Sequence, residues 1–402
     1  MRNIKFSPPD ITETEISYIT EVLKSNWITT GTKTKEFETK LSAFCTTNNT
    51  KCMSSATACL EMTLRLLGIG PGDEVITTPY TYSATCSVIY HVGARPIMVD
   101  LAPDSYEMDY NLLDSVINSN TKAIIPVDIG GILCNYTKII NILESHKHIF
   151  SFSNNIQKNI GRIAIIADSA HSLGSKYKNI ASGSWADFTV FSFHAVKNLT
   201  TAEGGAVTWN PKLNLNDNEI YDYLSLLSLH GQNKNALQKS IVGNWEYDII
   251  LLGYKCNMTD IHAAIGLAQF ERFGALLQKR KKIVEIYNQI LHNSQVKIYQ
   301  DSGKSGDSSN HLYILNLVSK TEDCRNEIIL KMAEIGITTN VHYKPLPMFT
   351  AYKKKGFDIN FFPNSYKMYA NEITLPLHTS MSCDDAEYVA VNFKKILEKN
   401  KN

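Results

Sequence analysis

The sequence lacks several features that would place it in a specialised class. Its 402 residues include eight cysteines but no Cys-x-x-Cys pair, so neither a zinc site nor a disulfide framework is indicated. The formal net charge is +1, which gives no electrostatic basis for binding nucleic acid or an anionic membrane. No stretch approaches the ~18 consecutive apolar residues of a membrane span. The start, MRNIKFSPPDITETE, lacks the apolar segment of a signal peptide. We therefore expect a cytoplasmic protein without a metal centre.

The composition is that of a globular protein, and the first helices can be predicted from their ends. Apolar residues make up 44% of the chain and charged residues 20%. Thr12 and Glu15 form a capping-box pattern before apolar residues at helical spacing. A second helix is predicted over SSATACLEMTLRLLG, ending at Gly68. At this length the chain can form an α/β domain together with a smaller one.

Five short apolar segments alternate with helical patterns: 74–79, 95–100, 122–128, 162–168 and 187–193. Continuous apolar strands separated by helices predict a largely parallel sheet covered on both faces. Three of these strands end on an aspartate, Asp100, Asp128 or Asp168. Because ligands bind beyond the carboxyl ends of such strands, Asp168 and the segment 192–197 are predicted to face one crevice.

The pattern changes at about residue 258, where one long helix is predicted over MTDIHAAIGLAQFERFGALLQKRKKIVEIYNQIL. We expect a large domain over 1–257, and this linking helix with a small C-terminal domain over 258–402. Residues 301–310 are predicted to form a polar loop, and residues 151–159 a polar insertion or hairpin just before the Asp168 strand.

A lysine follows the last of these strands, in FSFHAVKNLTTAEGG (191–205). Lys197 is either a solvated surface charge or a nucleophile toward a carbonyl group. Pyridoxal phosphate is the usual cofactor of such a lysine, and its pyridine nitrogen needs a carboxylate partner such as Asp168. The phosphate of the cofactor needs backbone N–H groups at a helix start, which the small residues from Ser55 onward offer. The ring of the cofactor needs a flat neighbour, such as Tyr82.

Each of these residues also has a purely structural interpretation. Ser55 and Thr57 suit a helix N-cap, and an aspartate at a strand end often caps a turn. Tyr82 suits a core, and His171 a satisfied structural histidine. Residue types and spacing leave both interpretations open.

A resemblance to a known family adds to this pattern. The segments DSAHSLGSKYKN and DFTVFSFHAVKNLTTAEGGAV closely resemble the DegT/DnrJ/EryC1/StrS family of nucleotide-sugar aminotransferases. The match runs in order from about residue 5 to the end, and it includes SSATACLEMTLRLLGIGPGDEVITTPYTYSAT, GYKCNMTDIHAAIGLAQF, SSNHLYIL and VHYKPL. It implies the α/β fold type I of PLP-dependent transferases, similar to aspartate aminotransferase. This fold has a large mixed-sheet domain and a smaller C-terminal α+β domain.

The resemblance also implies roles for individual residues. The implied catalytic residues are Lys197, Asp168 and His171. Lys197 would hold pyridoxal 5'-phosphate covalently and shuttle the proton, Asp168 would bind the pyridine nitrogen, and His171 would lie near the cofactor ring and its phenolic oxygen. Further cofactor contacts are implied for Ser55, Ala56, Thr57, Tyr82, Ser192, Lys255 and Asn257, the last two reaching the partner's site in a homodimer. Substrate contacts are implied for Trp27, Ile28, Thr29, His342, Tyr343 and Lys344.

The implied reaction moves the amino group of L-glutamate to a nucleotide-linked 4-keto sugar for a surface polysaccharide or glycan. The segment GYKCN departs from the Gly-Tyr-Asn-x-Arg of many relatives and is similar to enzymes of the lipid A branch, hence lipopolysaccharide. SSNHLYIL and VHYKPL instead resemble the pseudaminic-acid branch. Two alternatives are a dehydratase dependent on pyridoxamine phosphate, whose relatives replace the lysine with histidine, and a catalytically silent regulatory homologue.

Overall fold

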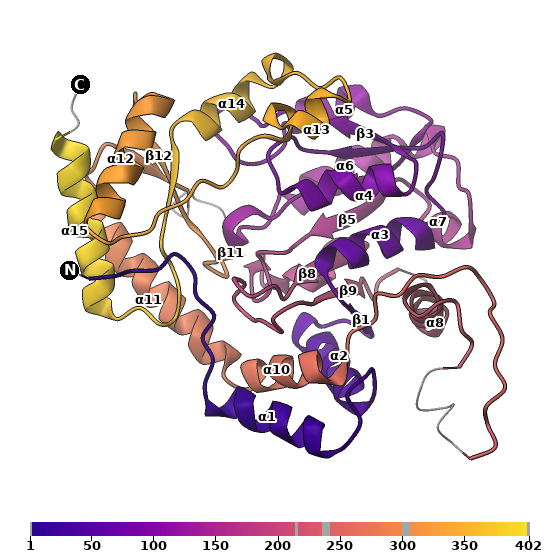
Figure 1. Ribbon diagram of the computed structural model, residues 1–402. Helices are drawn as coiled ribbons and strands as arrows, with labels where there is room; N and C mark the ends of the chain where they lie inside the picture. Colours follow the sequence, from indigo (N-terminus) through magenta and orange to yellow (C-terminus); the bar gives the residue numbers. More distant parts are fainter. Residues whose placement is uncertain (1, 214–215, 235–241, 300–305, 400–402) are drawn as a thin grey trace.

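A seven-stranded mixed sheet forms the centre of the larger part of the molecule (Figure 1). The computed structural model describes residues 2–213, 216–234, 242–299 and 306–399. The strand order is β1-β9-β8-β5-β4-β2-β3. Their bounds are β1 Thr50–Met53, β2 Glu74–Thr77, β3 Arg95–Met98, β4 Thr121–Ile125, β5 Ala164–Asp168, β8 Phe188–Ser192 and β9 Gly205–Trp209.

The pairing explains why five of these strands read as continuous apolar runs. Neighbours from β3 to β8 pair in parallel, whereas β9 pairs antiparallel with both β8 and β1. One hydrophobic cluster contains Val75 and Ile166, and another contains Ile76 and Ile165, so alternate residues of one strand pack in different clusters. The predicted parallel sheet with two covered faces is confirmed.

The helices of this part pack around the sheet (Figure 1). The capping box at Thr12 and Glu15 is present, and Gly68 ends the second predicted helix with φ +70°. The helices are α1 Glu13–Lys24, α2 Thr32–Cys45, α3 Ala56–Leu66, α4 Ser83–His91, α5 Tyr110–Val116, α6 Tyr136–Ser145, α7 Asn155–Ile160 and α8 Asp217–Ser228. Short 3-10 helices lie at Ile129–Gly131, Lys147–Ile149 and Ser182–Ser184.

The single long helix predicted from residue 258 is wrong. Two helices occupy this stretch, α10 Asp260–Glu271 and α11 Phe273–Leu291. At the break, Arg272 has φ −107° and ψ 6°, which is outside the helical region. Its guanidinium group contacts Asp10 at 3.0 Å and Glu15 at 2.9 Å. These tertiary contacts, which sequence periodicity cannot reveal, hold the chain at the point where the helix changes direction.

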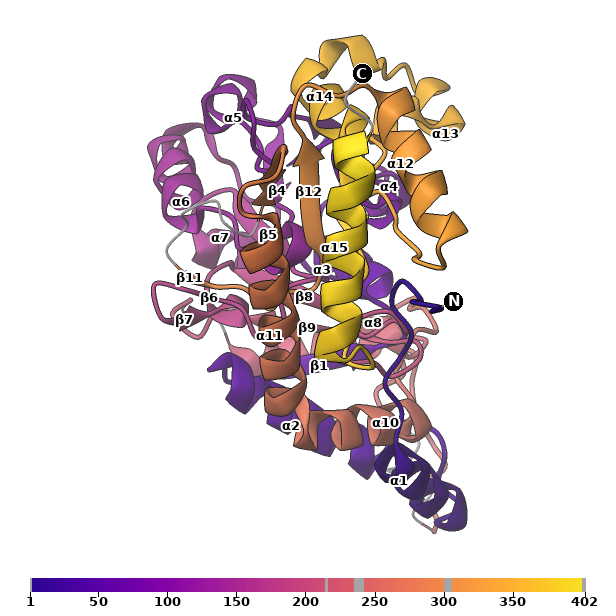
Figure 2. The same ribbon diagram turned by 90° about the vertical axis from the view of Figure 1, so that its left-hand side faces the viewer.

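The C-terminal part has its own sheet and core. Strand β12 lies between β10 and β13, and α11 and α15 run side by side against this sheet (Figure 2). Ile4 pairs with Ile337 and packs into this second core, so the N-terminal segment crosses to it. A division at residue 257 stays a prediction. The elements are β10 Val296–Ile298, β12 Tyr313–Leu317, β13 Glu372–Leu375, α12 Glu322–Glu334, α13 Thr350–Lys353, α14 Pro363–Ala370 and α15 Cys383–Lys399, with 3-10 helices at Leu346–Met348 and Ile359–Phe361.

The polar insertion at 151–159 contains helix α7 and no hairpin, so the hairpin alternative is wrong. Asn154 caps α7 and also donates to the Leu66 carbonyl at 2.9 Å. Gln157 donates to the Leu67 carbonyl at 2.6 Å. The insertion thus satisfies carbonyl groups at the C-terminal end of α3, which a helix cannot satisfy internally.

The predicted loop at 301–310 lies partly outside the described residues. Its last part includes β11 Gly306–Asp307, which pairs with β6 Lys176–Tyr177, and β6 pairs with β7 Ile180–Ala181. This small sheet ties the start of the segment 306–311 to the loop that follows Asp168.

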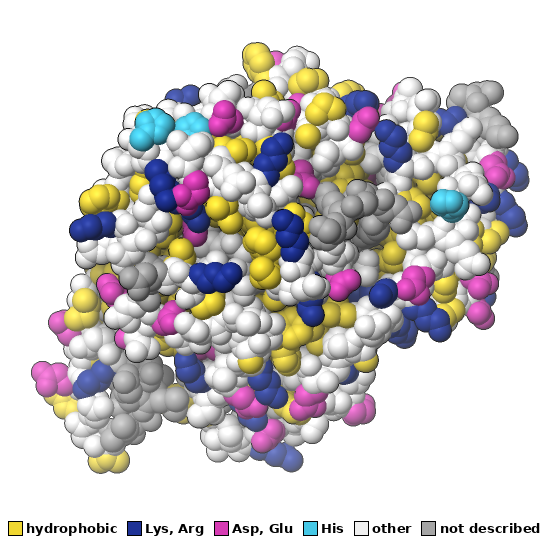
Figure 3. Space-filling model, turned by 180° about the vertical axis from the view of Figure 1, so that it is seen from behind, with side chains coloured by type: hydrophobic (Ala, Val, Ile, Leu, Met, Phe, Trp, Pro, Cys, Tyr) yellow, Lys and Arg dark blue, Asp and Glu magenta, His cyan; other side chains and the backbone are white. Residues whose placement is uncertain are grey.

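The surface agrees with the weak net charge. On the face shown in Figure 3, Lys and Arg are interspersed with Asp and Glu over the whole view. Among the described helices, none combines the length and the apolar character that crossing a membrane requires. Cys45, Cys52, Cys59, Cys86 and Cys134 are buried, as expected of cysteines that pack as small hydrophobic residues.

Candidate functional site

The carboxyl ends of neighbouring parallel strands bring the predicted site residues together. Asp168 is the last residue of β5 and Ser192 the last residue of β8, and these two strands pair in parallel. Lys197 follows Ser192 in a turn, and the backbone N–H of Lys197 donates to the His194 carbonyl at 2.9 Å. These residues therefore lie at one edge of the sheet, as predicted, whereas the crevice beyond this edge stays a prediction.

Asp168 is a buried carboxylate with well-defined donors. Thr85 Oγ1 donates to its Oδ2 at 2.6 Å, and the Ala170 N–H donates to its Oδ1 at 3.3 Å. Burial raises the pKa of Asp168, whereas the Thr85 bond and Lys197 oppose the shift. The other strand-end aspartates have structural partners instead: Asp100 binds Ser365, and Asp128 binds a cluster that includes Tyr136.

Lys197 is not a solvated surface charge. Its side chain is partly buried. Burial lowers its pKa to about 8, and the carboxylate of Asp168 opposes this shift. A lysine with such a pKa has a substantial neutral fraction near neutral pH, which is the form that attacks a carbonyl carbon.

His171 lies buried beside this pair. Its Nδ1 accepts a hydrogen bond from the Gly130 N–H at 3.2 Å, and its Nε2 lies 3.0 Å from Tyr343 Oη. Its ring centroid is 4.4 Å from that of His311. Burial, together with the positive charge of Lys197, holds the pKa of His171 well below its ordinary value. The imidazole is therefore neutral at physiological pH.

The start of α3 lies against β9, the strand that pairs with β8 and places Gly205 opposite Ser192. Ser55 is the N-cap, and its Oγ accepts from the Ala58 N–H at 3.1 Å. A Cβ at Gly205 would lie 2.3 Å from the Ala56 nitrogen, so only glycine permits this approach. Gly205 is in turn the register partner of Ser192. Ser192 and the first-turn N–H groups of α3 thus flank Gly205, and such N–H groups suit a phosphate.

The structure places Tyr82 on an accessible surface, so the core interpretation of this residue is wrong. Its side chain is 65% exposed at the N-cap of α4. Its ring centroid lies 6.3 Å from that of Tyr343. A ring with this exposure is accessible to a stacking partner.

The segment 342–344 enters the site from the C-terminal part of the chain. Tyr343 reaches His171, as described above. His342 Nδ1 lies 3.0 Å from Thr374 Oγ1, and burial lowers its pKa to about 3. Lys344 is exposed, with its ammonium 5.3 Å from the centroid of the Phe349 ring.

Residues 27–29 lie in the loop after α1. Trp27 donates to the Thr30 carbonyl at 3.3 Å, Ile28 is exposed, and the Thr29 carbonyl accepts from the Asp260 N–H at 3.1 Å. In the described part of the chain, these three residues make no hydrogen bond or ring contact with Lys197. Their implied substrate contact stays a prediction.

The segment 255–257 passes the start of α3 of the same chain. The Cys256 carbonyl accepts from the Ser54 N–H at 2.7 Å. Lys255 is exposed and bonds Asn257, whose amide donates to Thr30 Oγ1 at 2.6 Å. Thr259, rather than Asn257, caps α10.

Sequence reasoning did not single out Thr85, Asn198, Gly130 or His311. Asn198, next to Lys197, donates to the Ser309 carbonyl at 2.8 Å and contacts His311 Nδ1 at 2.9 Å. Thr85 and His311 lie in the segments PYTYSAT and SSNHLYIL, so proximity to a motif was the available signal. Gly130 acts through its backbone N–H, a group that every residue except proline carries, so its residue type does not reveal this contact.

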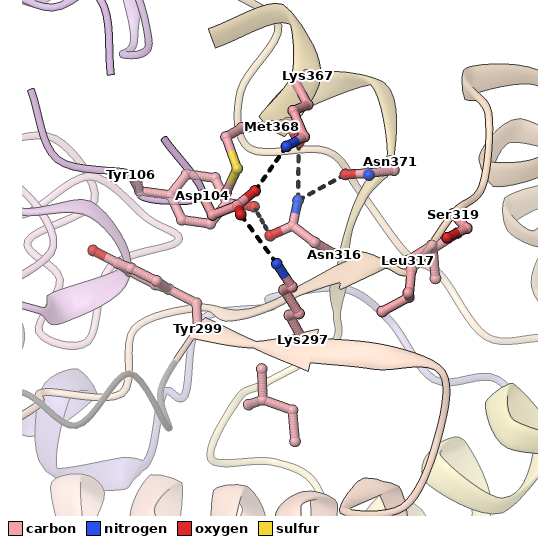
Figure 4. A pocket seen from close by; sticks show the side chains of 12 residues that line it. Asp104, Tyr106, Lys297, Tyr299, Asn316, Leu317, Ser319, Lys367, Met368 and Asn371 are labelled. Carbon is pink, nitrogen blue, oxygen red and sulfur yellow. Dashed lines mark hydrogen bonds and ion pairs between the residues drawn. The ribbon is translucent and has the colours of Figure 1, made fainter. Parts of the chain in front are cut away.

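A separate cavity of about 390 Å³ opens between residues 104–106 and the C-terminal sheet (Figure 4). Asp104 contacts Lys297 at 3.3 Å and Lys367 at 3.0 Å there. Tyr106, at the same cavity, donates to Asn316 at 2.7 Å. None of the predicted site residues lines this cavity.

The residues at the sheet edge fit pyridoxal phosphate. A lysine of lowered pKa suits its aldehyde carbon, a buried carboxylate suits its pyridine nitrogen, and a helix start beside a serine suits its phosphate. These groups lie on adjacent strands and on a helix that packs against them.

Comparisons with known proteins agree with a site for pyridoxal phosphate. The model of the DegT/DnrJ/EryC1/StrS aminotransferase family matches residues 9–394. The structure of the putative sugar aminotransferase Spr1654 from Streptococcus pneumoniae in its PMP form is 51% identical, with a TM-score of 0.96, and covers 99% of this chain and 100% of that one. The same protein has also been solved in a PLP form.

Two further relatives are more distant. PseC from Helicobacter pylori, an aminotransferase involved in the biosynthesis of pseudoaminic acid, is 28% identical with a TM-score of 0.86, over 99% of this chain and 100% of that one. The spore coat polysaccharide biosynthesis protein SpsC from Bacillus subtilis is 34% identical over 399 residues, 98% of this chain and 97% of SpsC. The chain therefore belongs to the DegT/DnrJ/EryC1/StrS aminotransferase family and is a PLP-dependent sugar aminotransferase.

Proposed function

We propose that the enzyme transfers the amino group of L-glutamate to a nucleotide-linked 4-keto sugar in the cytoplasm. The observation that carries this proposal is the pair formed by Lys197, with a pKa lowered to about 8, and the buried carboxylate of Asp168. The pair combines a nucleophilic amine with a partner for the pyridine nitrogen. The choice of glutamate rests on the family resemblance.

Each residue of the site has a defined task in this proposal. When bound, pyridoxal phosphate supplies an electrophilic carbon and an electron sink. Lys197 Nζ would hold the cofactor and carry the proton between the cofactor carbon and the reacting carbon of glutamate or of the sugar. Asp168, oriented by Thr85, keeps the pyridine nitrogen protonated. Ser192 and the start of α3 bind the phosphate.

Several features support a product used in a glycan. PseC is involved in the biosynthesis of pseudoaminic acid, and SpsC is a spore coat polysaccharide biosynthesis protein. The resemblance of GYKCN to enzymes of the lipid A branch supports lipopolysaccharide as a second destination. Lys197 stands where the related dehydratases carry histidine, which disfavours a dehydratase. The intact set of Asp168, Ser192 and Lys197 also disfavours a catalytically silent homologue.

The direct test supplies the purified enzyme with UDP-, dTDP- and GDP-linked 4-keto sugars and glutamate. The expected result is one aminated nucleotide sugar and an equal amount of 2-oxoglutarate. Incubation with glutamate alone should convert the cofactor to its amine form, seen as a change in absorbance. If the absorbance spectrum responds to another amino acid but not to glutamate, that other amino acid is the amino donor.

We further propose that the active enzyme is a homodimer with shared sites. The described residues 242–252 expose an unusual number of large apolar side chains to solvent: Val242, Trp245, Tyr247, Ile249, Ile250 and Leu252. An apolar surface of this kind is typical of a protein interface. It immediately precedes Lys255 and Asn257, the segment for which the family resemblance implies contact with the partner's cofactor.

A mixing experiment tests the shared site. One chain carries Lys197→Ala and the other carries Lys255→Ala with Asn257→Ala, each nearly inactive alone. One site of a mixed dimer then receives an intact lysine and an intact partner segment. Co-refolded mixtures should recover up to about a quarter of the wild-type activity, for half mixed dimers with one good site of two. Proven heterodimers without recovered activity would place both elements in one chain.

A further inference from the structure

The hydrogen bonds of His171 determine which of its nitrogens carries the proton. The Gly130 N–H donates to Nδ1 at 3.2 Å, so Nδ1 holds a lone pair. A neutral imidazole with an acceptor at Nδ1 must carry its proton on Nε2. Burial and the charge of Lys197 keep the pKa of His171 well below its usual range, so this neutral tautomer is the relevant state.

The proton on Nε2 has a partner, because Tyr343 Oη lies 3.0 Å away. Nε2–H is the donor in this pair, so the phenol oxygen is the acceptor. The ring centroids of His171 and Tyr343 lie 6.1 Å apart, and the two ring planes make an angle of 22°. A phenol that accepts through a lone pair keeps its own O–H for another acceptor.

The surroundings of Tyr343 place that hydroxyl in the site. The carboxylate of Asp168 and the phenol of Tyr82 both contribute to raising the pKa of Tyr343, after the effect of burial, so the hydroxyl stays protonated. In the described part of the chain, His171 is the hydrogen-bond partner found for the phenol oxygen. The O–H is therefore available to a bound molecule.

We propose that Tyr343 is a catalytic hydrogen-bond donor to an oxygen atom of the bound molecules, and that His171 is a positioning residue that acts through it. The acceptor is an oxygen with partial negative charge, either the phenolic oxygen of the cofactor or the carbonyl oxygen of the sugar. This proposal rests on the proposed function for the identity of the sugar. It differs from the family expectation, in which His171 itself lies near the phenolic oxygen.

The fixed geometry of His171 supports this division of roles. Its backbone carbonyl accepts from Ser309 Oγ at 2.5 Å, and its ring packs against His311. Both ring nitrogens are engaged, by Gly130 and Tyr343. A side chain held at its backbone, one ring face and both nitrogens suits the orientation of a neighbouring group.

The first test is a double-mutant cycle with Tyr343→Phe and His171→Leu. Each variant should lose about 10²-fold in turnover, the scale of one lost donor in a catalytic site. The double variant should be no worse than Tyr343→Phe, since both changes remove the same hydrogen bond to the bound molecule. Independent, multiplying effects would overturn the proposal.

A conservative variant separates positioning from mere packing. His171→Gln keeps an N–H donor near the position of Nε2, so it should retain turnover within about fivefold of wild type, well above the His171→Leu variant. Tyr287→Phe serves as the matched control, because it removes a buried hydroxyl bonded to the Pro376 carbonyl in the C-terminal core. His171→Gln activity as low as that of His171→Leu would contradict the assigned role.

Three measurements identify the acceptor: the spectrum and titration of the bound cofactor, the reaction with glutamate, and the reaction with the sugar. If it is the cofactor's oxygen, Tyr343→Phe should alter the absorbance and titration of the bound cofactor and slow the reaction with glutamate. If it is the sugar's oxygen, both should stay at wild-type values, and the sugar reaction alone should slow. Either result supports the donor role, whereas wild-type behaviour in all three would overturn it.

A readout without turnover tests the tautomer itself. In cofactor-free protein labelled with ¹⁵N-histidine, one neutral imidazole should show a protonated Nε2 and disappear in His171→Gln. Its Nε2–H resonance should shift in Tyr343→Phe. A proton on Nδ1 of His171 would overturn the inference. These spectra remain decisive if no sugar in the panel is aminated, which would count against the proposed function alone.

Discussion

Two of the described regions bring lysine and aspartate near one another, and the charges of the two groups behave differently. At the edge of the large sheet, Lys197 and the buried Asp168 both have pKa values shifted toward their neutral forms, because burial penalises the charges. At the cavity of Figure 4, Asp104 lies between Lys297 and Lys367, and these lysines lower its pKa. There, all three side chains are at least half exposed.

The difference shows that a charge partner alone does not create a reactive lysine. At the exposed pair, solvent stabilises every charge, so the partners merely reinforce ionisation. At the buried pair, loss of water makes the neutral amine accessible near neutral pH while the carboxylate is still close enough to interact. The ion pairs of Asp104 are therefore a polar contact between the two parts of the chain, and the proposed chemistry belongs to Lys197 and Asp168.

The largest effect is expected for Lys197→Ala. Removing the amine should lower turnover by at least ~10³-fold, because Lys197 is the group proposed to carry the proton. The protein should still bind the cofactor, but borohydride should no longer trap it on a single peptide. Turnover and mass spectrometry of the reduced protein provide the measurements. Wild-type turnover by this variant would remove Lys197 from the mechanism.

Asp168→Asn should have the next largest effect. Asparagine nearly preserves the shape and the Thr85 contact but cannot keep the pyridine nitrogen protonated, so the rate should fall ~10²-fold or more. Single-turnover kinetics with glutamate and a melting curve separate this effect from misfolding. Unchanged glutamate kinetics in a folded variant would contradict the role of the carboxylate.

The pH dependence of cofactor capture should sharpen the comparison. The neutral amine attacks, so capture by the cofactor-free protein should slow about tenfold per pH unit below the pKa of Lys197. The rate should rise with pH and level off near pH 8, the value to which burial lowers this pKa. Asp168→Asn removes the carboxylate that opposes the shift, so its plateau should begin at lower pH. A rate still rising at about pH 10 would indicate a solvated lysine.

The smallest effect is expected for Asp104→Asn at the exposed cavity. This change removes both ion pairs, yet exposed pairs contribute less than about 1 kcal/mol to the free energy of unfolding. Asparagine also tolerates the φ of +52° at this position. Turnover should stay within about twofold of wild type, and a melting curve should shift only slightly. A loss of activity as large as that of Asp168→Asn would mean that this cavity takes part in the reaction.

Much of the fold was predictable because it depends on local patterns. The strands, the capped first helix and the stop at Gly68 follow from periodicity and turn chemistry, and the structure contains all of them. The break at Arg272 was not predictable, because the carboxylates that hold it lie at Asp10 and Glu15, far away in the sequence. The helix of the 151–159 insertion likewise forms against the end of α3.

The properties of the site also divide into those that the local sequence determines and those that tertiary contacts determine. The sequence by itself determined which groups meet at the sheet edge, since parallel strands deliver Asp168, Ser192 and Lys197 to one side. Only the tertiary structure decided their chemical state, because burial is produced by segments that fold over them from elsewhere. Tyr343 reaches His171 from 172 residues away, and Asn198 is held by Ser309 and His311. A pKa depends on the water that these distant residues exclude, and no local pattern records that exclusion.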